Sequence, residues 1–351
     1  MNENRNVGIY KRKRKERSAE DFTNVKEIEV NAENLNGDFK KYATELTGIS
    51  QDVNLSFADR KVLSNDVAEV MDLFDRDRAL KIKSCGDFVM FDNGLISKKS
   101  KVTFANFCRE RLCPMCQWRK SRKLYSQICD VTDYISKQGN YRYLFLTLTV
   151  KNVKAEELDE TINHLFKSWT KFSRRKEFKK SILGYFRNLE VTYNLYRDDY
   201  HPHFHCLLLV NGSYFNGKNY IKQEEWQRLW KECAELDYEP QVNIKAVTQT
   251  EHRKDVSEVA KYTIKASDFL LTDIHKSAEV METIHYALKG RRLTTFSGML
   301  AKVMKTLKEE EDIDKADLTD NGIVEIEDEP IAKTLFRWNN GLQLYQLHRI
   351  K

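Results

Sequence analysis

Four stretches of the chain alternate between hydrophobic and polar side chains, or are short apolar runs, and therefore predict β-strands. The clearest alternation covers Tyr143–Val150. Residues 182–193, 203–210 and 241–247 are also predicted to be strands. Residues 194–200, rich in Asn, Asp and Tyr, separate the second strand from the third and predict a hairpin turn.

Other segments predict helices, over residues 54–80, 158–169 and 222–236 and from about 254 onwards. The basic segment 118–123 leads into a further helix that reaches about residue 136. From residue 143 the predicted order is β-α-β-β-α-β with a trailing helix. This order indicates an α+β domain of the ferredoxin-like or RRM-like split βαβ type. We expect a central antiparallel sheet covered on one side by helices, with a small cysteine-rich module and helical additions.

Charge is distributed unevenly along the 351 residues, with 59 Lys and Arg against 53 Asp and Glu. Basic blocks cover residues 11–17, 119–123 and 171–180, whereas residues 309–329 are acidic. Basic patches suit a polyanion such as nucleic acid. The chain has no apolar run of membrane-spanning length and no apolar signal region at its N-terminus, so we expect a cytoplasmic protein without membrane contact.

Four of the seven cysteines, Cys85, Cys108, Cys113 and Cys116, are spaced for a metal ion. The last pair forms a Cys-Pro-Met-Cys knuckle, which presents two thiolates to one ion, and the other two complete a closed structural zinc site. A redox Cys-x-x-Cys and isolated buried thiols are the alternatives. The remaining three, Cys129, Cys206 and Cys233, have the surroundings of ordinary core residues.

Basic side chains follow the cysteines and recur before the second strand. We expect these side chains to contact phosphates of nucleic acid, which makes the affinity salt-dependent. The candidates are Arg119, Lys120, Arg122, Lys123, Arg174 and Arg175.

Two histidines lie on one face of the third strand, because His203 and His205 are two residues apart and successive side chains of a strand point in opposite directions. Leu207 and Leu209 share this face. Such a pair can bind one metal ion from a rigid platform. The alternative is a strand end whose histidines meet solvent.

Glu258, Tyr262 and Lys265 are spaced i, i+4 and i+7 on the predicted last helix and would form one stripe. A tyrosine hydroxyl can attack a phosphodiester and hold a covalent phosphotyrosine link. The lysine can offset phosphate charge, and the glutamate can accept a proton. The alternative is an ordinary solvated helix face.

These motifs together resemble those of HUH endonucleases, and more narrowly the replication initiators (Rep) of small Gram-positive rolling-circle plasmids. The three ordered motifs are Phe-Leu-Thr-Leu-Thr at 145–149, His-Pro-His-Phe-His at 201–205 and Glu-Val-Ala-Lys-Tyr-Thr-Ile-Lys at 258–265. The cysteine segment at 107–118 and the segments at 288–293 and 297–300 also fit this group. The resemblance covers about residues 80–305.

The resemblance implies that His203 and His205 are metal ligands, with Phe204 as the hydrophobic residue between them. His201 is a lesser candidate. The third ligand is expected to be Glu190, the carboxylate inside the strand that should pair with the histidine strand, with Asp198 and Asp199 as rivals. Two imidazoles and a carboxylate suit Mg²⁺ or Mn²⁺.

The resemblance further implies a metal-dependent DNA nicking and joining endonuclease. Tyr262 would nick single-stranded or hairpin plasmid origin DNA, leaving a 5′-phosphotyrosine link and a 3′-hydroxyl primer. Lys265 would stabilise the transition state, and Glu258 would activate water at termination. Host helicase and DNA polymerase are the expected partners. The alternatives are a single-tyrosine HUH transposase or relaxase and, in another class, a non-catalytic zinc-containing nucleic-acid-binding regulator.

We therefore expect four regions in the chain. They are a polar and basic arm over 1–50, a helix with the cysteine-rich module over 51–136, the HUH nickase domain over 137–305 and an acidic tail over 306–351.

Overall fold

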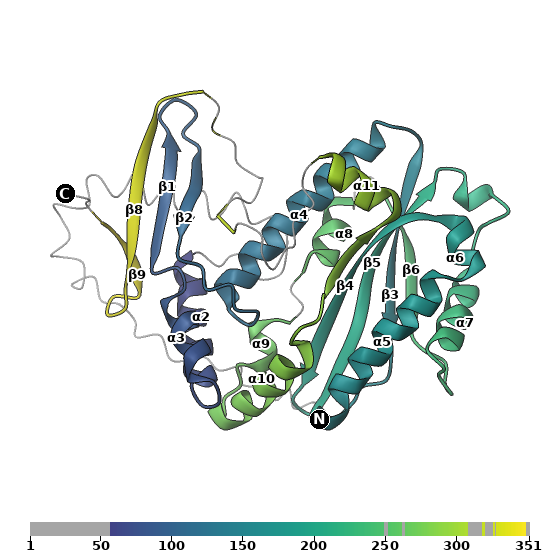
Figure 1. Ribbon diagram of the computed structural model, residues 1–351, viewed down its shortest axis with the longest axis horizontal. Coiled ribbons are helices and arrows are strands. Elements are labelled where there is room, and N and C mark those ends of the chain that lie inside the picture. Colours follow the sequence, from purple (N-terminus) through teal and green to yellow (C-terminus); the bar gives the residue numbers. More distant parts are fainter. Residues whose placement is uncertain are drawn as a thin grey trace, which may run out of the picture. The chain divides into compact units, whose positions relative to one another are not determined.

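A computed structural model describes residues 57–248, 252–261, 264–307, 318–319, 326 and 328–348 (Figure 1). The chain is α+β, as the sequence predicts, but it has two antiparallel sheets where the sequence predicts a single central one. It divides into two compact units. Of the described residues, the first unit holds 57–119, 269–279 and those from 318 onwards, and the second holds 120–268 and 280–307. The N-terminal arm predicted over 1–50 lies outside the described residues.

The first unit contains a four-stranded antiparallel sheet in the order β2-β1-β8-β9. Its strands are β1 (Phe88–Gly94), β2 (Ser100–Ala105), β8 (Ile331–Asn339) and β9 (Leu344–Leu347). The ring of Phe91 on β1 meets that of Phe336 on β8, with centroids 5.9 Å apart. β8 and β9 are not predicted from the sequence and lie in the region expected to be an acidic tail. The four-region division itself stays a prediction.

The prediction of one continuous helix over 54–80 is wrong, because the structure has two helices in this region. These are α2 (Phe57–Met71) and α3 (Arg76–Ser84). Asp75 interrupts the pattern, because its backbone is not helical and its carboxylate accepts a hydrogen bond from the amide of Arg78. A side chain that caps a helix in this way starts a new helix.

The second unit contains a five-stranded antiparallel sheet in the order β6-β3-β5-β4-β7. Its strands are β3 (Tyr141–Thr149), β4 (Ile182–Asn194), β5 (Asp199–Asn211), β6 (Val242–Val247) and β7 (Thr294–Ser297). The first four are the predicted strands, and β7 was not predicted. β5 lies at the centre, between β3 and β4.

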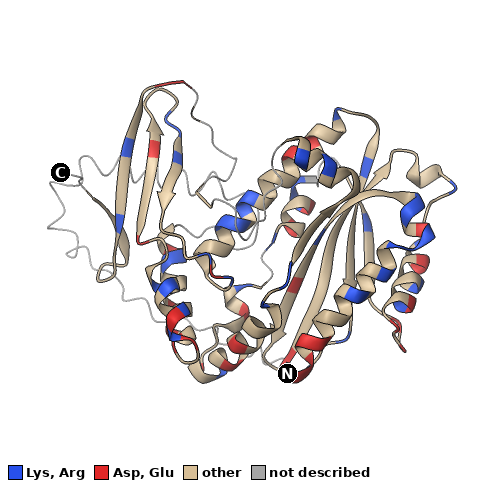
Figure 2. Ribbon diagram, viewed as in Figure 1, with Lys and Arg blue, Asp and Glu red and all other residues tan. Residues whose placement is uncertain are grey.

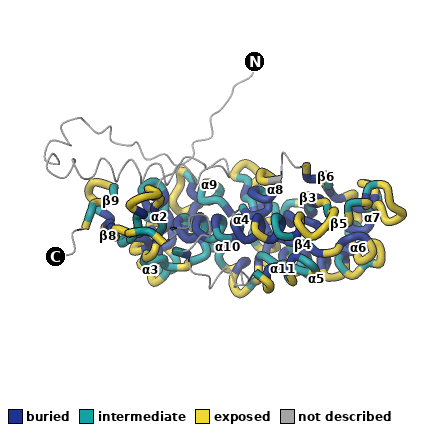
Figure 3. Tube along the Cα trace, turned by 90° about the horizontal axis from the view of Figure 1, so that it is seen from above, coloured by how far each residue is buried: buried dark blue, intermediate teal, exposed yellow. Residues whose placement is uncertain are grey.

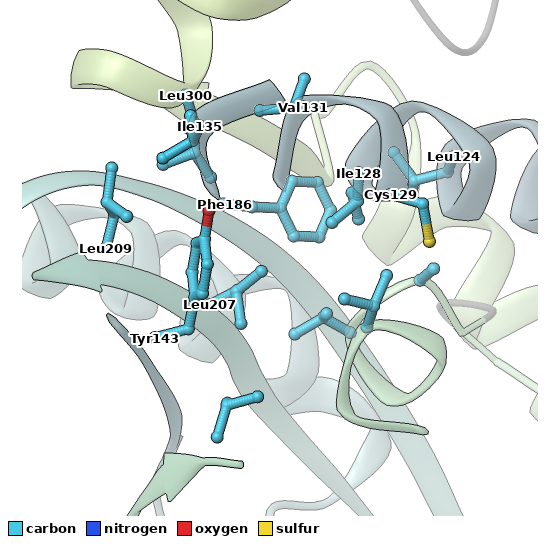
Figure 4. Close-up of a cluster of buried hydrophobic side chains, with 14 of the residues drawn as sticks. Leu124, Ile128, Cys129, Val131, Ile135, Tyr143, Phe186, Leu207, Leu209 and Leu300 are labelled. Atoms are coloured by element: carbon cyan, nitrogen blue, oxygen red, sulfur yellow. The ribbon is translucent and has the colours of Figure 1, made fainter. Parts of the chain in front are cut away.

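Helices cover both faces of this sheet, so the expectation of a single covered face is wrong (Figure 1). On one face, Phe204 of β5 contacts the rings of Phe166 and Trp169. On the other, Leu207 and Leu209 join side chains of three helices in one buried cluster (Figure 4). The first face is covered by α5 (Leu158–Ser173) with α6 (Lys176–Ser181) and α7 (Gln223–Cys233), and the second by α4 (Pro114–Ser136), α8 (His252–Val259) and α11 (Gly298–Thr306).

The sequence of β5 explains this burial. Residues 206–210 are all buried and apolar, so both faces of the strand are apolar along this stretch. Figure 3 shows buried segments, in dark blue, among the strands of this sheet. A strand covered on both faces is apolar at consecutive positions, whereas a half-covered one alternates. The histidines occupy the adjoining end of the same strand.

The remaining elements are short or connect the others. They are η2 (Ala155–Glu157), η3 (Tyr214–Asn216), α9 (Ala266–Phe269) and α10 (Ile274–Leu288). None of the helices in the described part of the chain has the length and apolar character needed to cross a membrane.

We predict that Leu207→Ala lowers the free energy of unfolding by about 2–5 kcal/mol, because it leaves a cavity between the sheet and its covering helices. Leu183→Ala on β4 is the matched control, because Leu183 is 40% exposed and Leu207 is fully buried. The control should cost about 1 kcal/mol or less. Urea unfolding followed by circular dichroism measures both, and equal losses would contradict the assigned core.

Candidate functional site

The pairing of β4 with β5 brings one carboxylate and two histidines together. In this antiparallel register Glu190 lies opposite His203, and Asn188 lies opposite His205. The hairpin turn holds this register, because the side chain of Asn194 accepts hydrogen bonds from the amides of Tyr196 and Arg197. The predicted hairpin thus places Glu190 on the histidine face of the sheet.

The three side chains form a group that could hold a metal ion. Glu190 Oε2 lies 2.8 Å from His205 Nε2 and 3.5 Å from His203 Nε2, and the two Nε2 atoms are 3.1 Å apart. Two ligands about 2.1 Å from an ion and at right angles to each other lie about 3.0 Å apart. The donor atoms are therefore spaced as neighbouring ligands of one ion.

Hydrogen bonds at the other ring nitrogens orient both imidazoles. His203 Nδ1 lies 3.1 Å from the carbonyl oxygen of His201, to which it can only donate. His205 Nδ1 lies 3.3 Å from the hydroxyl of Thr147. A histidine that donates through Nδ1 has its Nε2 lone pair free for a metal ion. The Nε2 atoms of both rings face Glu190.

Glu190 is buried, with 6% of its surface exposed. Burial opposes ionisation of its carboxyl, but hydrogen bonds and positive charge from His203 and His205 hold its pKa well below the usual value. The side chain is therefore ionised at neutral pH and suits a divalent cation.

The other candidate ligands do not join this group. Asp198 accepts a hydrogen bond from the hydroxyl of Tyr193, and Asp199 pairs with Arg197 at 2.9 Å. The ring of His201 lies 5.0 Å from that of His203. Burial lowers the pKa of His201 to about 4, so this side chain is neutral at physiological pH.

The four cysteines singled out by their spacing also meet in space. Their sulfur atoms all lie within 4.8 Å of one another, and Cys116 Sγ is 3.5 Å from Cys85 Sγ and 3.6 Å from Cys108 Sγ. Sulfur atoms about 2.3 Å from one zinc ion in a tetrahedron lie about 3.8 Å apart. This group therefore matches a closed tetrahedral site.

Backbone amides surround these sulfur atoms. The amides of Cys108 and Arg109 donate to Cys85 Sγ and Cys116 Sγ at 3.3 and 3.1 Å. Arg109 adopts a left-handed φ of 61°. Burial opposes ionisation of the Cys113 thiol, but hydrogen bonds from the other three cysteines hold its pKa well below the usual value. Without an ion the cluster thus favours one thiolate, whereas a cation could stabilise several.

The predicted continuous helix carrying Glu258, Tyr262 and Lys265 is wrong, because α8 ends at Val259. Tyr262 lies outside the described residues. Glu258 is half-buried in the last turn of α8 and pairs with Lys261 at 2.5 Å. Lys265 lies outside any helix, just before α9. Glu258 and Lys265 therefore do not lie on one helix.

Side chains from elsewhere in the fold end α8. Asn188 Nδ2 donates to the carbonyls of Val259 and Lys261, at 3.1 and 3.0 Å. Ser121 Oγ donates to the carbonyl of Ala260 at 2.6 Å. In a continuing helix, amides of the next turn would bond these carbonyls. Here side-chain donors on β4 and α4 bond to all three.

The structure corrects the expectation that Arg119 and Arg122 contact DNA, because both are buried. The Arg119 guanidinium donates to the carbonyls of Leu318 and Thr319, each at 2.6 Å. A buried guanidinium must find such partners, since leaving it unpaired is costly. Arg119 therefore holds two chain segments of the first unit together.

The other basic candidates remain accessible to different degrees. Lys120 and Lys123 are half-buried on α4, and Arg174 is exposed after α5. Arg175 is half-buried and pairs with Glu232 at 2.7 Å. Figure 2 shows further basic positions along α6.

Two polar residues near the histidine face were not predicted from the sequence. Asn188 precedes Glu190 by two positions, and a polar residue inside an apolar strand was the available signal. Asp268 lies on α9. Burial raises the pKa of Asp268 to about 6, with the charge of Glu190 acting in the same direction and that of Lys265 opposing it. No local pattern singled out Asp268.

Comparison with known proteins gives consistent matches. Residues 99–346 match a family model described as "Replication protein". The chain is 34% identical over 299 residues to "Protein rep" of Lactiplantibacillus plantarum, which covers 82% of this chain and 93% of the relative. It is 36% identical over 259 residues to "Protein rep" of Streptococcus pneumoniae serotype 2, covering 71% and 78% of the two chains. No solved structure matches the chain.

We predict that Glu190→Gln weakens Mn²⁺ binding by about tenfold or more, because it removes the anionic ligand of the group. Asp199→Asn is the matched control and should leave the affinity unchanged, because Asp199 pairs with Arg197 instead. Titration of Mn²⁺ into zinc-loaded protein, followed by calorimetry, measures both constants. Weaker binding in Asp199→Asn alone would place the third ligand in the turn.

Proposed function

Because this chain belongs to the replication protein family, we propose that it initiates rolling-circle replication of a plasmid by nicking single-stranded origin DNA. The observation that carries this proposal is the buried Glu190–His203–His205 group on paired strands. The same strand pair contacts the end of α8, the helix that leads to Tyr262, through Asn188. A metal-binding group and a tyrosine-containing segment are the two parts that nicking chemistry requires.

The topology of the second unit supports an HUH-type assignment. The order β6-β3-β5-β4 is that of a split βαβ unit, with β5 inserted between the parallel strands β3 and β4. The His-Pro-His-Phe-His motif lies on this central strand. We therefore assign the domain to the HUH endonucleases.

The donor set suits Mg²⁺ or Mn²⁺. Imidazole nitrogens and a carboxylate favour such ions over the thiophilic ones, and Glu190 provides the buried negative charge. When bound, the ion polarises the scissile phosphate as a Lewis acid. The protein residues orient the ligands, because the β4–β5 register and the Nδ1 contacts fix the two rings.

Tyr262 is the proposed nucleophile. Its phenolic oxygen loses a proton and forms a bond to the scissile phosphorus, and the bond from phosphorus to the 3′ oxygen breaks. That oxygen takes up a proton and becomes the 3′-hydroxyl primer, while the 5′ phosphate stays on the tyrosine. Lys265, which follows the tyrosine by three residues, offsets charge on the phosphate.

Glu258 is the proposed base for termination. It is half-buried at the end of α8, four residues before the tyrosine, and it pairs with Lys261, the residue that directly precedes the tyrosine. In this role it takes a proton from water that attacks the second phosphodiester, and the bond from phosphorus to the 3′ oxygen breaks to leave a 3′-hydroxyl. This hydroxyl then loses its proton and attacks the phosphotyrosine, the bond from phosphorus to the Tyr262 oxygen breaks, and the displaced strand closes as the tyrosine regains its proton. This division would release the protein after one round.

Two further parts of the protein support DNA binding in this proposal. Lys120, Lys123 and Arg174 contact backbone phosphates. Arg175 can do so only after its ion pair with Glu232 breaks. The four cysteines hold a structural zinc ion that fixes the loops around them. Origin DNA is the primary partner. Host helicase and DNA polymerase are expected partners, because they act on the nicked origin.

We predict that Tyr262→Phe abolishes a covalent DNA adduct while leaving DNA binding intact, because only the attacking oxygen is removed. A labelled single-stranded origin oligonucleotide, incubated with Mn²⁺, should give a wild-type band that survives SDS. Changing both His203 and His205 to Ala should also abolish it, and Tyr196→Phe in the exposed hairpin turn is the matched control. An undiminished band in Tyr262→Phe would show that the nucleophile lies elsewhere.

We predict that Glu258→Ala retains the initial nicking rate but slows hydrolytic termination by about 10²-fold or more, because a positioned general base is lost. Glu225→Ala is the matched control, since Glu225 is also a helical glutamate in a close ion pair. Release of closed circular single strands from a two-origin plasmid measures termination. Loss of the initial nick in Glu258→Ala would contradict this division of roles.

A further inference from the structure

Asn188 makes two hydrogen bonds that no local pattern of the sequence requires. It is 1% exposed, and its Nδ2 donates to the carbonyls of Val259 and Lys261. Both partners are acceptors only, so the amide nitrogen and not the oxygen must face them. The side chain of one strand thus holds the chain just beyond α8.

Ser121 on α4 adds a third hydrogen bond to the same chain segment. Its hydroxyl, on α4, donates to the carbonyl of Ala260, between the two carbonyls that Asn188 binds. Three successive carbonyls therefore accept hydrogen bonds from side chains rather than only from the next helical turn. Val256 and Val259 of α8 also pack in the core cluster, so the helix end is held by apolar contacts as well.

The position of Asn188 links this helix end to the metal-binding group. Asn188 and Glu190 are two residues apart on β4 and lie on the same face, about 7 Å apart along the strand. Asn188 also lies directly opposite His205 in the β4–β5 register. One rigid strand therefore carries both a metal ligand and the side chain that binds the carbonyl of Lys261.

The carbonyl of Lys261 belongs to the peptide group that joins Lys261 to Tyr262. We propose that Asn188, assisted by Ser121, is a positioning residue that sets the distance between the nucleophile segment and the Glu190–His203–His205 group. This inference rests on the proposed nicking function. Asn188 acts through the backbone and does not itself react.

A purely stabilising role fits the contacts of Asn188 less well. Its Oδ1 is buried and has no hydrogen-bond partner within the described residues. A buried amide with one unpaired end costs stability that an apolar side chain of similar size would not. A role in holding the end of α8 at a fixed position relative to β4 explains why an asparagine is present despite this cost.

The test compares variants that remove these donors. Asn188→Leu removes both bonds of Nδ2 at similar volume, Ser121→Ala removes the third bond, and Ser121→Thr keeps the hydroxyl. Thr132→Val is the matched control, because it removes another buried hydroxyl-to-carbonyl bond, that of Thr132 to Cys129 on α4. The first readout is the single-turnover rate of adduct formation with saturating oligonucleotide and Mn²⁺. The second is the affinity for the oligonucleotide and for Mn²⁺, each measured in a Tyr262→Phe background.

We expect the rate to fall about 10²-fold in Asn188→Leu and less in Ser121→Ala, because small misplacements of a reacting group slow the chemistry. The affinities for oligonucleotide and Mn²⁺ should stay unchanged, and Ser121→Thr should react like the wild type. Thr132→Val should lower thermal stability without slowing the reaction.

Wild-type rates per folded molecule in both Asn188→Leu and Ser121→Ala would overturn the inference. Parallel losses of rate and of Mn²⁺ or DNA affinity would overturn it too, because Asn188 would then act on binding. If the wild-type protein forms no adduct at all, the proposed nicking function fails and this inference fails with it.

Discussion

The antiparallel pairing of β4 with β5 is the constraint on which the candidate site depends. Because side chains alternate along a strand, a slip of one residue would move Glu190 to the opposite face from His203 and His205. The turn prevents such a slip through the Asn194 side chain and through Asp198, whose φ of 49° is in the left-handed region. Local turn chemistry thus helps to bring Glu190, His203 and His205 together.

Burial on both faces of the sheet holds this strand pair rigid. On the face opposite the histidines, the guanidinium of Arg187 lies 4.7 and 4.6 Å from the ring centroids of Phe166 and Phe204. Burial lowers the pKa of Arg187 to about 10, yet the group stays charged at neutral pH and stacks between aromatic rings. On the histidine face, α4 and α8 pack on β5 through Leu207 and Leu209. The ligands therefore project from a backbone fixed on both sides.

The parts of the site that follow from local sequence could be predicted. Alternation placed His203 and His205 on one face, and the hairpin made Glu190 the carboxylate nearest to them, as the structure confirms. The Cys-Pro-Met-Cys spacing likewise indicated a metal-type cysteine cluster, because a knuckle brings two sulfur atoms together through local geometry alone. The two remaining cysteines complete the cluster, as predicted.

The features that depend on distant residues could not be predicted. The periodicity of 254–265 indicates one helix, but hydrogen bonds from Asn188 and Ser121, far away in sequence, end it at Val259. Arg119 appeared to be a surface cation because its segment is basic, whereas carbonyls some 200 residues later bind it in the interior. The pairing of β8 with β1 joins segments that are even farther apart in sequence, and nothing in the pattern of either strand indicates its partner.

The central claim is that the chain forms a covalent link to DNA through one particular tyrosine. Its most direct test is mass spectrometry of the trapped complex after digestion with nuclease and trypsin. The account predicts a nucleotide 5′-phosphate on the peptide Tyr262–Lys265, which trypsin releases by cleavage after Lys261 and Lys265. A nucleotide on another residue, or nicked DNA with no modified peptide, would contradict the claim.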